Sequence, residues 1–174
     1  MKKEAIEVLM NRRAVRKFKS EQITDEQLQT ILEAGTYAPT GRNRQTPWII
    51  AVQNPEEREA VSKLNAKVMG ADTDPYYGAP TVVIVVAPED GVFGNLNGAA
   101  VITNMVNAAY AVGVDSCWIH RPLEMFRTEE GKAMLKKWGI TEDVIGIGSI
   151  ALGYADMPVP AASPRKENYY RIIK

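Results

Sequence analysis

A run of apolar residues at 80–87, PTVVIVVA, constrains the fold of this chain more than any other segment. The five consecutive residues from Val82 to Val86 are β-branched, and no polar residue alternates with them. β-Branched side chains favour strands, and a strand without polar alternation is typically covered on both faces. The run therefore predicts a central strand in a sheet that is buried on both sides.

Helical and strand patterns mix along the rest of the chain. Thr24 and Gln27 form a capping-box pattern, Pro55 suits a first helical turn, and Gly35 and Gly70 suit helix ends. These signals and the apolar spacing predict helices over 4–16, 24–35, 55–70, 98–112 and 129–138, and strands over 48–52, 116–119 and 144–152. The fold class is therefore α+β or α/β with a covered sheet.

Three segments stand out from this pattern. The predicted helix 98–112 is apolar nearly all round, which indicates burial in a core or a dimer interface. Residues 38–47 are polar and contain glycine and proline, so we expect a loop, and such loops often hold functional sites. Residues 153–174 hold three prolines and form no helix, yet they end in large apolar residues. This tail is either frayed or docked on its own core or a partner subunit, and docking is favoured.

Composition limits the classes of function. Lys and Arg total 21 and Asp and Glu total 21, so no overall field attracts nucleic acid or an anionic membrane. The charge is uneven, because residues 1–19 hold seven basic residues against two acidic ones. One cysteine and one histidine exclude an internal disulfide and the usual zinc sets. No apolar run is long enough to span a membrane, and we expect one cytoplasmic domain over residues 1–174 with no metal.

Several catalytic signatures are missing or lack their context. Residues 146–151 match GxGxxA, but no helix follows them, so we interpret these glycines as sites of close backbone packing. Cys117 lies near His120 but beside apolar residues, which favours a buried strand cysteine over a nucleophile. No catalytic side chain is identified.

The most informative element is the arginine cluster Arg12, Arg13 and Arg16. If the first helix persists, Arg12 and Arg16 lie on one face, where like charges repel. Two interpretations remain open at this point: the arginines stabilise a helix C-terminus, or they bind an anion such as a phosphate monoester.

Four segments in order resemble the nitroreductase family of FMN-dependent oxidoreductases. They are RRAVR at 12–16, APTGRNRQTPW at 38–48, the helix with Asn104 and Met105 leading to GVDSCWI at 113–119, and PRK at 164–166. The resemblance spans essentially the whole chain. It implies an α+β fold with a covered central β-sheet flanked by helices, and a homodimer in which the C-terminal tail docks on the partner subunit.

The resemblance also assigns roles to residues. The phosphate and the pyrimidine edge of FMN are assigned to Arg12, Arg13, Ala14 and Arg16, with Arg165 and Lys166 completing the phosphate site. The ribityl chain and the ring are assigned, across the dimer interface, to Pro39, Thr40, Gly41, Asn43 and Gln45. Backbone contacts near flavin N5 are assigned to His120 and Arg121. Ala14 departs from the family's frequent serine, and Thr46 departs from a direct Gln-Pro-Trp sequence.

The activity that the resemblance implies is a ping-pong hydride transfer through flavin N5, from NADH or NADPH to a small-molecule acceptor such as a nitroaromatic or a quinone. Enone-reducing or dehalogenating enzymes on the same scaffold are one alternative. A flavin-binding or redox-sensing module without turnover is another. A third interpretation has the basic ends contacting an acidic partner protein.

Overall fold

The centre of the molecule is a four-stranded antiparallel sheet with the order β1-β2-β4-β3. The computed structural model describes residues 4–89 and 93–174. The strands are β1 Trp48–Val52, β2 Thr81–Pro88, β3 Asp115–Ile119 and β4 Val144–Gly153. Residues Val82 to Val86 are fully buried in β2, which pairs with β1 on one side and β4 on the other. The prediction of a central strand is confirmed.

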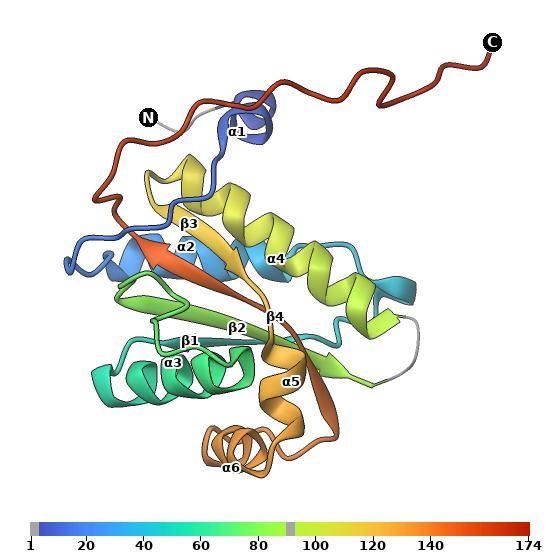
Figure 1. Ribbon diagram of the computed structural model, residues 1–174. Coiled ribbons are helices and arrows are strands. Elements are labelled where there is room, and N and C mark those ends of the chain that lie inside the picture. The colour runs from blue at the N-terminus through green and yellow to red at the C-terminus, as the bar shows by residue number, and fades with distance from the viewer. Residues whose placement is uncertain (1–3, 90–92) are drawn as a thin grey trace.

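Helices cover both faces of this sheet (Figure 1). Their bounds are α1 Ala5–Asn11, α2 Asp25–Thr36, α3 Pro55–Met69, α4 Phe93–Ala111, α5 Pro122–Arg127 and α6 Glu129–Lys137, with a 3₁₀ turn at Gly41–Asn43. The α2 and α4 helices bury one core with Val83 and Val85, while α3, α5 and α6 bury a second core on the opposite face. The expected α+β class with a covered sheet is confirmed. Within the described ranges, no helix has both the length and the apolarity to cross a membrane.

Local capping explains where α2 and α3 begin. The Thr24 side chain accepts from the Gln27 backbone N–H, and the Gln27 side chain accepts from the Thr24 backbone N–H, which completes the predicted capping box. Asn54 accepts from the first two free N–H groups of α3, next to Pro55, and Gly70 ends that helix with a φ of 71°. Since these contacts satisfy otherwise unpaired backbone groups, they fix the helix ends without tertiary help.

The first helix is shorter than predicted, and this correction matters for the arginines. It ends at Asn11 instead of continuing to residue 16, and Arg12 has extended backbone angles. The Val15 N–H donates to the Ser116 carbonyl at 3.0 Å, so residues 14 and 15 run beside β3 instead of forming another helical turn. The predicted helix over 4–16 is therefore too long, and its condition for placing Arg12 and Arg16 on one helix face is not met.

Three further expectations need correction. Gly35 does not end α2, which continues to Thr36. It is buried against α4, where a Cβ would stand 2.8 Å from Met105 Cγ. The α5 helix falls where no helix was predicted. The α4 helix begins earlier than residue 98, at Phe93, and in this single chain Leu96 on its outer side is exposed.

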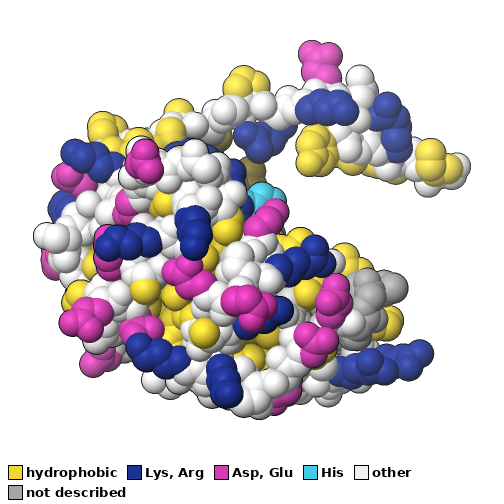
Figure 2. All heavy atoms as spheres, turned by 60° about the horizontal axis from the view of Figure 1, so that its bottom comes forward, with side chains coloured by type: hydrophobic (Ala, Val, Ile, Leu, Met, Phe, Trp, Pro, Cys, Tyr) yellow, Lys and Arg dark blue, Asp and Glu magenta, His cyan; other side chains and the backbone are white. Residues whose placement is uncertain are grey.

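The C-terminal tail leaves the body after a short anchored stretch. Ala155 bridges Phe18, and Lys17 forms an ion pair of 2.7 Å with Asp156. Residues 158–174 are exposed throughout, and Figure 2 shows the tail standing away from the body. Docking of the tail on its own core is therefore wrong, and docking on a partner subunit stays a prediction.

A half-buried carboxylate, Asp74, organises the connection between α3 and β2. Asp74 accepts hydrogen bonds from Arg58, Ser62 and the backbone N–H groups of Tyr76 and Gly78. Partial burial alone raises the pKa of Asp74, but these four hydrogen bonds outweigh it and hold the pKa below the ordinary value. The ionised carboxylate therefore stabilises the fold.

We expect Asp74→Asn to lower the free energy of unfolding at pH 7 by about 1–3 kcal/mol, because a charged acceptor is lost. The stabilisation by Asp74 is present above its unfolded pKa of about 3.9 and is lost as the pH falls through the lower folded pKa. The difference between wild type and variant, measured by urea unfolding at pH 7 and near pH 3, should shrink in acid. A difference that does not change with pH would contradict this assignment.

Candidate functional site

The arginine segment lies along the outer edge of the sheet. Ala14 forms a parallel bridge with Ser116 of β3, and the chain around it carries the arginines. Arg12, Arg13 and Ala14 are half-buried and Arg16 is exposed. Arg13 donates to the carbonyl oxygens of Met10 and Arg12 at 2.9 and 2.8 Å, so the helix-end interpretation holds for this one side chain.

Arg12 and Arg16 bring positive charge that no carboxylate in the described part of the chain neutralises through an ion pair. Both charges act on Cys117 of β3. Burial is the dominant influence and raises the pKa of that thiol, while Arg16 and Arg12 act in the opposite direction. Cys117 is therefore a buried structural cysteine, as predicted. Two of the seven basic residues at 1–19, Lys2 and Lys3, lie outside the described residues.

The loop at 38–47 follows α2 and wraps the first turns of α4. Arg42, Asn43 and Gln45 adopt left-handed φ angles of 57°, 54° and 50°. Such angles cost energy in residues other than glycine, so surrounding contacts must hold them. The Thr40 hydroxyl accepts from the Gln45 backbone N–H at 3.1 Å, and the Gln45 amide donates to Asn43 Oδ1 at 3.1 Å. The loop thus presents two exposed side-chain amides on a fixed backbone.

Asn97 and Phe93 of α4 hold this loop, and sequence patterns did not reveal either residue. The Gly41 backbone N–H donates to Asn97 Oδ1 at 2.9 Å, and a Cβ on Gly41 would stand 2.6 Å from the Phe93 ring. Asn97 is only 4% exposed, and its Nδ2 has no hydrogen-bond partner within the described ranges. Gly41 is therefore required by packing, and a buried amide donor remains available next to the loop.

The turn between β3 and α5 forms a third part of the site. His120 is exposed, and Arg121 has a φ of 83° as it begins α5. A surface hollow at this turn is lined by Met69, Thr73, Asp74, Pro75, Tyr77, Trp118, Ile119, His120 and Arg121. The turn therefore offers backbone groups and aromatic side chains at an accessible surface.

Gly146 and Gly148, the glycines of the GxGxxA match, allow β4 to pack closely against the residues around this turn. A Cβ on Gly146 would overlap the carbonyl group of Pro122, and a Cβ on Gly148 would overlap the Trp118 indole nitrogen. Both glycines lie in β4, where the register with β2 shifts between Val85 and Val86. The interpretation of close backbone packing is confirmed, because the match lies within a strand.

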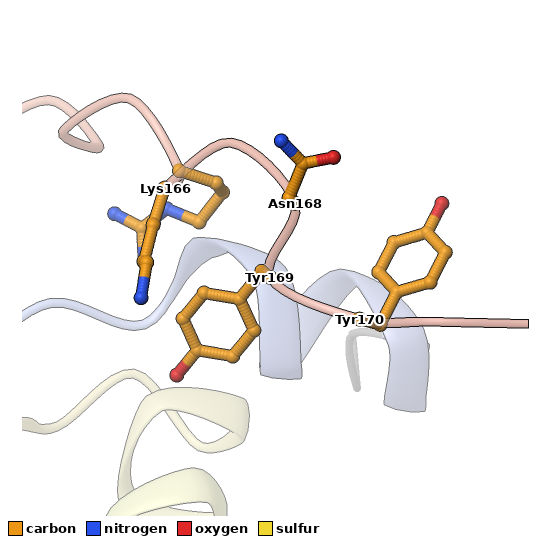
Figure 3. Close-up of a pocket in the computed structure, with 5 residues that line it drawn as sticks. Lys166, Asn168, Tyr169 and Tyr170 are labelled. Atoms are coloured by element: carbon orange, nitrogen blue, oxygen red, sulfur yellow. The ribbon is translucent and has the colours of Figure 1, made fainter.

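Arg165 and Lys166 lie in the exposed tail, far along the chain from the anchored stretch. Figure 3 shows Lys166, Asn168, Tyr169 and Tyr170 around a shallow hollow, and the residues that line it all belong to the tail. The Arg165 guanidinium donates only locally, to the Ser163 carbonyl. This hollow is a curl of exposed chain and not a pocket in the body.

A single chain does not gather these parts into one pocket. The arginine segment pairs with the beginning of β3, and the 120–121 turn follows the end of β3. The 38–47 loop contacts the first turns of α4 instead (Figure 1). The tail points away from both. The family resemblance implies that a second chain completes the site, and this stays a prediction.

Comparisons with known proteins agree with this architecture. A model of the Nitroreductase family matches residues 9–154. A protein from Archaeoglobus fulgidus, provisionally named NADH dehydrogenase/NAD(P)H nitroreductase, is 29% identical over 157 residues, which cover 87% of this chain and 85% of that protein.

Two solved structures share the fold over nearly the whole chain. A nitroreductase from Bacteroides fragilis with bound FMN has a TM-score of 0.91 and 30% identity, covering 99% of this chain and 100% of that one. A nitroreductase from Desulfitobacterium hafniense, also with bound FMN, has a TM-score of 0.88 and 24% identity, with both chains covered completely.

The packing at Gly146 generates a stability prediction. Gly146→Ala should lower the free energy of unfolding by about 3 kcal/mol or more, because the new methyl group meets backbone that cannot turn aside. Gly153→Ala in the same strand is the matched control, since its nearest atoms are side-chain atoms at 3.1 Å. Thermal unfolding of both variants checks this, and equal losses would contradict a special role for Gly146.

Proposed function

The chain belongs to the nitroreductase family of oxidoreductases, and on that premise we propose that it binds FMN and passes a hydride from NADH or NADPH to a small-molecule acceptor. The observation that carries the proposal is the pair of guanidinium groups, Arg12 and Arg16, beside β3, which form no ion pair with any carboxylate of residues 4–89 and 93–174. Two such positive charges exceed what a helix C-terminus requires, whereas a bound anion would balance them. The FMN bound in the Bacteroides fragilis relative supports the choice of ligand.

The arginine segment fits a phosphate. Guanidinium groups donate forked hydrogen bonds that match phosphate oxygens, and such charge-assisted bonds are the strong ones in proteins. Arg12 and Arg16 remain available for this contact, and Arg13 keeps the segment in place through its carbonyl contacts. Ala14 contributes backbone only, so it adds no hydroxyl donor. Arg165 and Lys166 would complete the phosphate site from the tail of a second chain.

The 38–47 loop fits the polar parts of a flavin. Side-chain amides offer both donors and acceptors, which suits ribityl hydroxyls and the ring edge. Asn43 and Gln45 are exposed on a backbone held by Thr40 and Gly41, and the buried Asn97 Nδ2 is a further unpaired donor in the described structure. Pro39 lies exposed at the start of the same loop. These features support flavin contact by Pro39, Thr40, Gly41, Asn43 and Gln45 across an interface.

A homodimer accounts for the exposed apolar residues. Ile6, Leu9 and Met10 leave one face of α1 uncovered, and Tyr169, Tyr170, Ile172 and Ile173 are exposed in the tail. Contiguous apolar surface on this scale marks interaction sites. We propose that in a homodimer the tail of each chain covers the apolar face of α1 on the other chain. The same arrangement would bring the loop of one chain to the arginines of the other.

The roles of the chain's residues follow from this arrangement. Bound FMN supplies the hydride chemistry at N5, so no catalytic side chain is needed. Arg12 or Arg16 would stabilise negative charge at the pyrimidine edge, and the backbone at His120 and Arg121 would contact the N5 region. Donor and acceptor use one site in turn, which gives ping-pong kinetics with nitroaromatic or quinone acceptors. A flavin module without turnover would show no NADH or NADPH oxidation, and an enone-reducing or dehalogenating enzyme would prefer those acceptors.

The first test is the ultraviolet–visible spectrum of the purified protein. We expect flavin absorption, and after denaturation a chromatographic match of the released molecule to FMN, at about one per chain. Reduction of the bound flavin by NADH or NADPH should follow in stopped-flow measurements. A protein that is colourless and does not take up added FMN would overturn the proposed function.

Arg16→Ala should weaken FMN binding roughly tenfold to a hundredfold, because a charge-assisted hydrogen bond is worth about 1.5–3 kcal/mol. Riboflavin lacks the phosphate, so its dissociation constant should hardly change if Arg16 binds the phosphate, whereas a contact of Arg16 with the pyrimidine edge would weaken riboflavin binding as well. Titration of flavin fluorescence with both ligands separates the two effects. Lys67→Ala removes an exposed cation that pairs with Glu130 instead, and it should leave both constants unchanged.

Removal of residues 158–174 should shift the chain from dimer to monomer in analytical ultracentrifugation, because the exposed tail carries apolar residues. The double change Arg165→Ala and Lys166→Ala should leave the dimer intact and weaken FMN binding. If the shortened chain stays dimeric at low micromolar concentration, the tail does not contribute to assembly.

A further inference from the structure

Three buried polar side chains meet beneath the end of β3. Asn65 belongs to α3, Tyr76 to the connection that precedes β2, and Ser149 to β4, and all three are fully buried. Their polar atoms form a chain of hydrogen bonds. Polar groups in a core carry a desolvation cost unless they are paired, and an apolar core would avoid that cost. The position of this chain therefore calls for an explanation.

The direction of every hydrogen bond follows from counting protons. Asn65 Nδ2 has two hydrogens, which it donates to the Tyr76 hydroxyl at 3.1 Å and to the His120 carbonyl at 3.0 Å. Ser149 Oγ has one proton and gives it to the Ile119 carbonyl at 3.3 Å, so the Tyr76 hydroxyl is the donor in its 3.1 Å hydrogen bond with Ser149 Oγ. Both ends of the chain of hydrogen bonds are backbone carbonyls, and Asn65 Oδ1 is the one polar atom of the three side chains that has no hydrogen-bond partner within the described residues.

Those two carbonyls belong to consecutive residues of the β3–α5 turn. The next residue, Arg121, adopts a left-handed φ of 83°, which is unusual for a residue with a side chain. The carbonyl of Arg121 accepts from the Met125 N–H at 2.9 Å in the first turn of α5. The turn is thus fixed from the network on one side and from α5 on the other.

Tyr76 is itself held in place. Its backbone N–H donates to Asp74 Oδ1 at 2.9 Å, and Asp74 is fixed in turn by Arg58 and Ser62. Burial raises the pKa of the Tyr76 phenol, so the proton that it donates to Ser149 stays bound. The network therefore keeps one state over the working pH range.

We propose that Asn65, Tyr76 and Ser149 are positioning residues that orient the 119–121 backbone toward bound FMN. This role rests on the proposed function, in which that backbone faces the N5 region of the flavin. The network ends on the carbonyls of Ile119 and His120, directly before Arg121, so it fixes the direction in which this stretch of backbone points.

Tyr76→Phe tests the role, with Tyr154→Phe as the matched control. Tyr154 donates one phenol hydrogen bond to Gln27 on the opposite face, so Tyr154→Phe removes a phenol hydroxyl that has no contact with the 119–121 turn. Tyr76→Phe loses two hydrogen bonds and should cost more stability, so both variants are compared at a temperature where both are folded. We expect Tyr76→Phe alone to shift the midpoint potential of bound FMN and to slow its reduction, at saturating FMN and NADH, roughly threefold to tenfold, the equivalent of one hydrogen bond. Tyr154→Phe should match wild type in both measurements.

Ser149→Ala cuts the same chain one bond later and serves as the second variant. The double variant of Tyr76→Phe and Ser149→Ala should slow reduction no more than the larger single effect, because both changes interrupt the same chain of hydrogen bonds that leads to the Ile119 carbonyl. If both single variants match the control in potential and rate, the network is structural only and the proposal is overturned. A wild-type protein that binds no FMN would instead overturn the proposed function, and this role with it.

Discussion

Burial of β2 on both faces is the constraint on which the rest of the structure depends. A strand of consecutive β-branched residues needs neighbours on both edges and helices on both faces, so β1 and β4 flank it and two separate cores form. That arrangement leaves β3 beyond β4, at the edge of the sheet. The free edge of β3 then accepts the Val15 N–H, which brings the arginine segment to the sheet.

Much of the fold could be predicted from local signals. The Thr24 cap of α2, Pro55 and Gly70 at the two ends of α3, and the apolar run of β2 act over a few residues, and the structure agrees with each. The first helix was overpredicted because the competing partner for Val15 lies about a hundred residues further along, at Ser116, and no local pattern reveals it. The α5 helix was missed because it is short and begins with a proline after a left-handed residue.

The residues of the candidate site also fall into those that local sequence signals reveal and those that they do not. Clustered arginines and a polar loop stand out in the sequence, and the resemblance gave them roles that experiment has still to test. Asn97, and the network of Asn65, Tyr76 and Ser149, were invisible, because each is an ordinary polar residue whose partner is distant in the chain. Such residues gain their meaning only when tertiary structure buries them and leaves a particular carbonyl or amide as the available partner.

The state of Cys117 has a consequence for how the protein meets oxidants. Its thiol is 4% exposed and burial raises its pKa, so little reactive thiolate forms. Sulfenic acid formation and glutathionylation follow thiolate character and exposure, so this cysteine resists both. Because the chain has no other cysteine, a thiol introduced on the surface would be the single site for maleimide attachment. A fluorophore placed in this way on the tail would report its position without any cysteine having first to be removed.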